Sequence, residues 1–96
     1  MKKLLIKIFN HFGPTEQMLK FEEEAHEAIK AVFEGNRDRV VDEFADLSNL
    51  MDQWRIHYKI DPSEILRRKE FKINRTLQRI NDRYYENNTV DKGADV

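Results

Sequence analysis

The fold is decided by residues 21–50, whose sequence is FEEEAHEAIKAVFEGNRDRVVDEFADLSNL. Two carboxylate pairs lie in this stretch, Glu24 with Glu27 and Glu43 with Asp46, and each pair has the spacing i, i+3. On an α-helix this spacing places both side chains of a pair on one face. The stretch therefore predicts two helices that each present a pair of acidic side chains.

Gly35 lies midway between the two pairs. The inner carboxylates, Glu27 and Glu43, each lie eight residues from it, and the outer ones, Glu24 and Asp46, each lie eleven. If Gly35 is the tip of an antiparallel helix pair, a rise of about 1.5 Å per residue brings the four carboxylates together at matching heights. Clustered like charges need compensation, and hard oxygen ligands without Cys select Mg²⁺ or Mn²⁺. Either pair alone would be interpreted as an ordinary solvated helix face.

Composition limits the class of protein. The chain has 96 residues, of which 40% are apolar and 36% charged, and it has no Cys. This length predicts one small domain over residues 1–86 with a thin core, which a homodimer or homotetramer would extend. The absence of Cys excludes disulfides and thiolate metal sites and fits a cytoplasmic location. The net charge of −1 indicates no nucleic-acid or membrane partner.

The hydrophobic pattern predicts an all-α antiparallel helical bundle. Apolar residues at helical spacing place helices at residues 16–34, 38–58 and 62–85. Residues 1–12 are basic and apolar, and we expect an N-terminal arm, helical or strand-like, that packs on the domain or on a second subunit. Residues 87–96 are polar without periodicity and are expected to be a disordered tail. The expected core face of the second helix consists of Val40, Phe44, Leu47, Met51, Trp54 and Tyr58.

Charge is unevenly distributed along the chain. Residues 16–46 contain ten acidic and four basic side chains, whereas residues 62–83 contain three acidic and seven basic ones. The last helix has a basic stripe formed by Arg68, Lys72, Arg75 and Arg79. Such a stripe can hold phosphate groups through charge-assisted hydrogen bonds. The alternative is that it is simply solvated, or that it pairs with the acidic half of the chain.

Glu23 and His26 form a Glu-x-x-His motif, which carboxylate-bridged di-iron bundles carry on each of two helices. The second helix has no His near Asp46, so a di-iron site is the weaker interpretation. A second alternative is a non-catalytic helical module that binds a nucleotide or a protein through its acidic surface.

The carboxylate motifs resemble those of the MazG-like family of all-α nucleoside triphosphate pyrophosphohydrolases, and the similarity covers about residues 12–79. The matching segments are Gln17-x-x-Lys20, Glu23-Glu24-Ala25-His26-Glu27, Glu43-x-x-Asp46, Ile60-Asp61-Pro62-Ser63-Glu64 and Lys72-Ile73-Asn74-Arg75. The resemblance implies Mg²⁺-dependent cleavage between the α- and β-phosphates of a (d)NTP, which gives a (d)NMP and pyrophosphate. It also implies dimers or dimers of dimers with sites built across subunits.

The resemblance also implies roles for individual residues. It makes Glu24, Glu27, Glu43 and Asp46 the metal ligands. It makes Lys72, Asn74 and Arg75 contacts for phosphate, with Lys20 as a further candidate for binding substrate. Attack at phosphorus requires an oriented water, and a spare carboxylate can act as its general base. Glu23 is one candidate for that catalytic role, and the alternative is a metal-bound water that acts alone.

Overall fold

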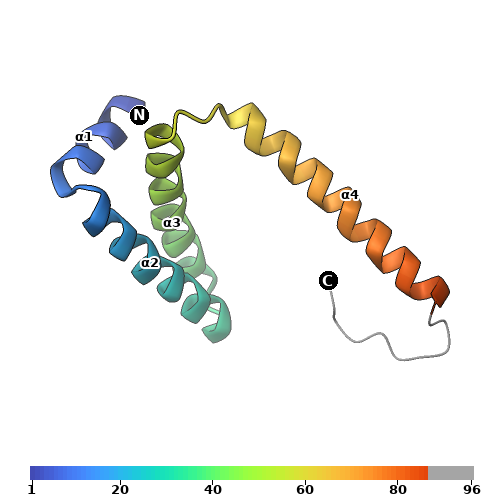
Figure 1. Cartoon of the computed structure of the whole chain (residues 1–96). Coiled ribbons are helices and arrows are strands. Elements are labelled where there is room, and N and C mark those ends of the chain that lie inside the picture. Colours follow the sequence, from blue (N-terminus) through green and yellow to red (C-terminus); the bar gives the residue numbers. More distant parts are fainter. Residues whose placement is uncertain (87–96) are drawn as a thin grey trace. The chain divides into compact units, whose positions relative to one another are not determined.

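The structure, a computed structural model, describes residues 1–86 as four α-helices. Their bounds are α1 (Lys2–Phe12), α2 (Pro14–Glu34), α3 (Arg37–His57) and α4 (Pro62–Glu86) (Figure 1). The described residues contain no strand, so the all-α fold class is confirmed. The chain divides into two compact units, Met1–Ile60 and a second unit from Asp61 onward. The expectation of one domain over residues 1–86 stays a prediction, and the expected tail lies outside the described residues.

Gly35 forms the tip of the α2–α3 hairpin, as the sequence predicts. Its φ of 72° is left-handed, a conformation that glycine adopts without steric cost. Its N–H donates to the carbonyl oxygens of Ala31 and Val32, both at 3.1 Å, which closes the last turn of α2. The Asn36 side chain then caps α3 by accepting from the N–H of Arg39 at 3.2 Å. This turn sets the register in which the carboxylates of the two helices face each other.

The N-terminal arm is a helix that packs on both α2 and α3 (Figure 1). Phe9 anchors it and is 6% exposed. The Phe9 ring meets Trp54 edge-on at 5.1 Å between centroids and lies 4.7 Å from the ring of His57. Aromatic contacts of this kind add to the burial of apolar area. The arm is thus a helix and not strand-like, and in the single chain it packs on α2 and α3.

The start of α4 is set by its cap. Asp61 accepts from the N–H of Ser63 at 2.9 Å, and the Glu64 side chain accepts from the N–H of Asp61 at 3.0 Å. This reciprocal arrangement is a capping box, with Pro62 at the first helical position. Within residues 1–86, no helix combines the length and hydropathy required to cross a membrane.

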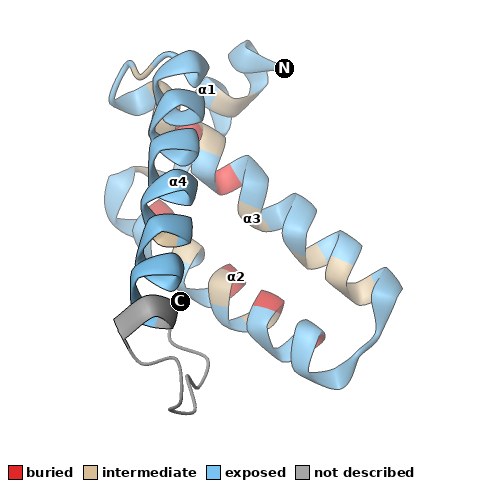
Figure 2. Ribbon diagram, turned by 90° about the vertical axis from the view of Figure 1, so that its right-hand side faces the viewer, coloured by how far each residue is buried: buried red, intermediate tan, exposed pale blue. Residues whose placement is uncertain are grey.

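The core between the helices is thin, and much of it is polar. Among the described residues, the buried apolar side chains are Phe9, Ala28, Ala31 and Leu50, and the buried polar ones are Gln17, Glu24 and Gln53 (Figure 2). Only two of these buried side chains, those of Phe9 and Leu50, are large and apolar. The contact between α2 and α3 therefore combines Leu50 with small and polar residues.

The prediction of a core face on α3 is wrong for three of its residues, which are exposed in the single chain. Phe44, Met51 and Tyr58 are 50%, 53% and 68% exposed, because the neighbouring stripe of Glu43, Asp46, Leu50 and Gln53 faces α2 instead. Helical spacing gathers several exposed apolar residues on one face of each helix. We call this surface the outer apolar face, and it consists of Met18, Ile29, Val32, Phe33, Phe44 and Met51.

Candidate functional site

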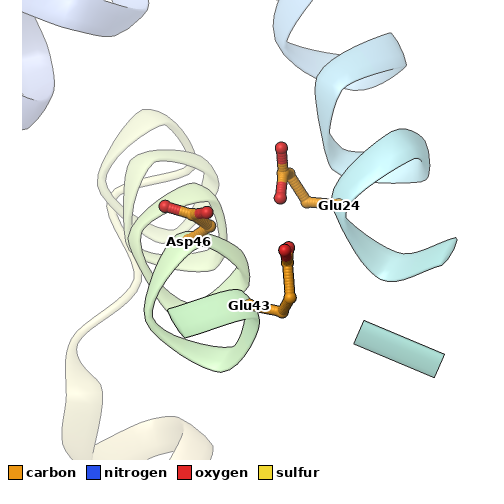
Figure 3. Close-up of side chains that lie close together, drawn as sticks. All are labelled: Glu24, Glu43 and Asp46. Atoms are coloured by element: carbon orange, nitrogen blue, oxygen red, sulfur yellow. The ribbon is translucent and has the colours of Figure 1, made fainter. Parts of the chain in front are cut away.

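Three of the four predicted metal ligands converge between α2 and α3. Glu24 projects from α2, and Glu43 and Asp46 project from α3, with their carboxylates directed toward one another (Figure 3). One carboxylate oxygen from each residue lies within 4.8 Å of those from the other two. Glu24 is buried, Glu43 half-buried and Asp46 exposed. We call this group the acidic triad, and its oxygen-only donor set fits a hard divalent cation.

Electrostatics in the acidic triad are unfavourable for three free carboxylates. Burial raises the pKa of Glu43, and hydrogen bonding with Glu24 and the negative charges of Glu24 and Asp46 raise that pKa further. The positive charge of Arg39 acts in the opposite direction. A cation between the three carboxylates would relieve this repulsion. The geometry and the pKa shift therefore agree on a place for positive charge.

The raised pKa of Glu43 predicts a pH dependence in metal-free protein. A carboxyl group with a higher pKa in the folded than in the unfolded chain gives the folded state the greater affinity for protons. The free energy of unfolding should therefore fall as pH rises from the ordinary value of 4.5 through the folded pKa of Glu43. Urea denaturation in EDTA across this pH range measures it, and Glu43→Gln should remove the fall. Parallel curves for the two proteins would contradict the prediction.

Glu27, the fourth predicted ligand, is held apart from the triad by an ion pair. Its carboxylate accepts from the Arg39 guanidinium at 3.2 Å, and the same guanidinium donates to Glu34 at 2.6 Å. Arg39 comes from the first turn of α3, so it bridges the two helices next to their turn. Glu27, which the sequence predicts to lie level with Glu43, therefore pairs with Arg39 in this structure.

Removal of Arg39 should make the protein more dependent on a bound cation. We expect Arg39→Gln to lower the metal-free free energy of unfolding by about 0.5–1 kcal/mol, because Glu27 and Glu34 lose their shared partner. Addition of Mg²⁺ should then raise the melting temperature more than in wild type. Arg37→Gln, at an exposed position two residues earlier, is the charge-matched control. An equal Mg²⁺ response in all three proteins would rule out this role for Arg39.

Lys20 and Glu23 lie beside the triad on α2. The Lys20 ammonium is 3.1 Å from a Glu24 oxygen and 3.7 Å from a Glu23 oxygen. Hydrogen bonding with Glu24, followed by the charge of Glu23, raises the pKa of Lys20. The side chain of Glu23 is 62% exposed and does not belong to the triad. Lys20 is therefore the positive charge nearest Glu24 in the described unit.

The remaining predicted substrate contacts belong to α4. Lys72 and Arg75 line a basic groove with Arg67, Arg68 and Phe71, in which the Arg75 guanidinium lies 5.9 Å from the centroid of the Phe71 ring. Asn74 is exposed on the same helix and does not line this groove. The positive stripe predicted from the sequence is thus present on the surface of α4.

A cavity of about 470 Å³ adjoins the acidic triad. Glu24 and Asp46 line one part of it, and Gln17 and Gln53 line another. The two glutamines are joined by a hydrogen bond of 2.7 Å from Gln17 Nε2 to Gln53 Oε1. Gln53 is not among the residues predicted from the sequence, although Gln17 and Gln53 each lie eighteen residues from Gly35, a symmetry like that of the carboxylates.

Comparison with known families agrees with this geometry. Residues 10–70 match the family profile described as phosphoribosyl-ATP pyrophosphohydrolase (PRA-PH), which is more than half of the chain. The chain belongs to the PRA-PH family. Comparisons with curated proteins and with solved structures give no match. The PRA-PH match contains all of α2 and α3 and ends before Lys72.

The PRA-PH family belongs to the MazG-like all-α superfamily, which confirms the resemblance at that level. Its members are pyrophosphohydrolases that act on a nucleotide, so the chain is assigned to this class of hydrolase. The family is typically metal-dependent, and the acidic triad provides oxygen ligands for a metal ion.

Proposed function

We propose that this PRA-PH family member is a Mg²⁺-dependent pyrophosphohydrolase of nucleoside triphosphates. It would cleave the α–β phosphoanhydride of a (d)NTP to give a (d)NMP and pyrophosphate. The observation that carries the proposal is the convergence of Glu24, Glu43 and Asp46 within 4.8 Å on two facing helices. Phosphoryl transfer depends mainly on positioning and on charge neutralisation, and an oxygen-lined cation site supplies both.

The acidic triad would hold the cation. Glu27 would complete the site by leaving its ion pair with Arg39 and binding the cation instead. A bound Mg²⁺ neutralises phosphate charge and lowers the pKa of a coordinated water. Mn²⁺ has similar ligand preferences and is expected to substitute for it.

The chain's own side chains would then act on the substrate. Lys20 is paired with Glu24, and a cation on Glu24 would leave its ammonium available for a substrate phosphate. Glu23 is solvent-accessible beside Lys20 and is proposed as the general base that accepts a proton from the attacking water. Lys72, Asn74 and Arg75 are proposed as further phosphate contacts, with charge-assisted hydrogen bonds from the two basic side chains.

We further propose that a second copy of the chain covers the outer apolar face, in a homodimer or homotetramer. Ile29 is 66% exposed and Phe33 92% exposed, whereas few apolar side chains of the described residues are buried. A chain this small buries too little apolar area alone, and isologous pairing of this face would extend the core. A cytoplasmic location and the absence of nucleic-acid and membrane partners stay predictions.

A pyrophosphate-release assay tests the proposed function. Purified protein is incubated with each NTP and dNTP, and with phosphoribosyl-ATP because the family profile carries that name. We expect release from at least one (d)NTP with Mg²⁺ and none in EDTA. If pyrophosphate were released from phosphoribosyl-ATP alone, that compound would take the place of a (d)NTP as the proposed substrate. No release from any nucleotide, together with nucleotide binding, would favour the non-catalytic module.

A further inference from the structure

The buried pair of Gln17 and Gln53 has hydrogen-bonding capacity that the fold does not use. The two side chains are 4% and 5% exposed, and one hydrogen bond of 2.7 Å joins them. Gln17 Oε1 and Gln53 Nε2 take no part in this bond, and neither atom has a hydrogen-bond partner among the described residues. Buried amides cost free energy unless their donors and acceptors are satisfied. The pair therefore leaves one carbonyl oxygen and one amide N–H group without a partner, on two residues that both line the cavity.

The free hydrogen-bonding groups of this pair are the same whichever way the two side-chain amides are flipped. In any hydrogen bond between two glutamines, one supplies N–H and the other supplies C=O. What remains is always a free acceptor on one residue and a free donor on the other. Nucleobases present a neighbouring donor and acceptor on their Watson–Crick edge, and proteins bind that edge through such groups.

The lining and the volume of the cavity also suit a nucleotide. Its apolar wall consists of Ile8 and Phe12 from α1 and Leu50 from α3, which suits the faces of a planar ring. Its volume of about 470 Å³ lies within the range of roughly 300–1,000 Å³ that is typical of small-molecule sites.

The amide pair and the acidic triad lie at a fixed separation along both helices. Gln17 precedes Glu24 by seven residues, and Gln53 follows Asp46 by seven. Seven residues are two helical turns, or about 10 Å. A ligand in this cavity can thus meet amides at one end and a cation with phosphate at the other, as a nucleoside with a 5′-phosphate would.

We propose that Gln17 and Gln53 bind the hydrogen-bonding edge of the substrate's nucleobase while the acidic triad holds the cation that neutralises its phosphates. The inference rests on the proposed function and adds the base-binding end of the same site. Helix α1 contributes the wall against which the base packs. The N-terminal arm is therefore part of the substrate site.

Nuclear magnetic resonance of the side-chain amides tests this without turnover. Protein labelled with ¹⁵N is titrated, in the presence of Mg²⁺, with AMP, CMP, GMP and UMP, and with ribose 5-phosphate as the base-free control. We expect the amide resonances of Gln17 and Gln53 to shift with at least one nucleotide and not with ribose 5-phosphate. Gln78, which donates to Asp82 on α4, is the internal reference that should not shift.

The matched variant is Gln17→Leu/Gln53→Leu, which removes both amides together and leaves neither one buried without its partner. Affinity for the preferred nucleotide should fall roughly tenfold, while affinity for ribose 5-phosphate stays unchanged. Gln78→Leu should alter neither affinity. The inference would be overturned if the Gln17 and Gln53 amide resonances shifted with none of the four nucleotides. It would also be overturned if the double variant lost affinity equally for the nucleotide and for ribose 5-phosphate.

The two proposals fail separately in these experiments. Pyrophosphate release without base-dependent amide shifts leaves the enzyme assignment standing and removes the base-binding role of the glutamines. Base-dependent shifts without pyrophosphate release keep the glutamines as a nucleotide contact and remove the enzyme assignment.

Discussion

Glu43→Gln is expected to lower kcat/KM for pyrophosphate release by about a hundredfold to a thousandfold and to abolish stabilisation by Mg²⁺. Glu43 lies in the acidic triad with Glu24 and Asp46, so its loss leaves two carboxylates to hold the cation. Positioned charge of this kind is usually among the largest contributions to the rate of such reactions. Steady-state kinetics and melting temperature with and without Mg²⁺ measure the two effects.

The same substitution should raise the melting temperature of metal-free protein. Burial and the charges of Glu24 and Asp46 disfavour the ionised Glu43 carboxylate, and a neutral amide removes this repulsion. Greater stability combined with lost activity distinguishes a damaged cation site from a damaged fold. Glu22→Gln, an exposed acid on α2 outside the triad, is the control and should leave activity and Mg²⁺ response unchanged. Normal pyrophosphate release by Glu43→Gln would refute the metal site.

Ile29→Glu is expected to convert the oligomer into monomers. Ile29 is 66% exposed and belongs to the outer apolar face, so a second copy that covers this face would have to bury the new charge. Burial of an unpaired carboxylate costs several kcal/mol, so the dissociation constant should rise by about a hundredfold or more. Sedimentation velocity over a range of protein concentrations measures the change.

Lys30→Glu is the matched control for this prediction. It alters the charge of the adjacent residue by a larger amount, but Lys30 is exposed and lies outside the outer apolar face. We expect Lys30→Glu to sediment like wild type. If wild-type protein is itself monomeric, or if Ile29→Glu keeps the wild-type sedimentation coefficient, the outer apolar face is not the interface.

Much of the fold follows from local pattern. Helical periodicity predicted α2, α3 and α4, and the structure differs from those predictions by one or two residues at their ends. Counting from Gly35 predicted that Glu24, Glu43 and Asp46 would meet, because a tight turn sets the register of two antiparallel helices. The same count missed the separation of Glu27, because it says nothing about the reach of the long Arg39 side chain across the turn.

The sequence by itself determined that the described chain is helical, that α2 and α3 pair about Gly35, and which acidic residues share a height. These features depend on the helical period and on the spacing of residues along the chain, and the sequence specifies both completely. Only the tertiary structure decided which stripe of each helix faces its neighbour. Periodicity defines the stripes but not what packs against each one, because that depends on the total contact energy of elements distant in sequence. In this protein the polar stripe, with its carboxylates and amides, lies inside the hairpin, and much of the apolar stripe remains outside.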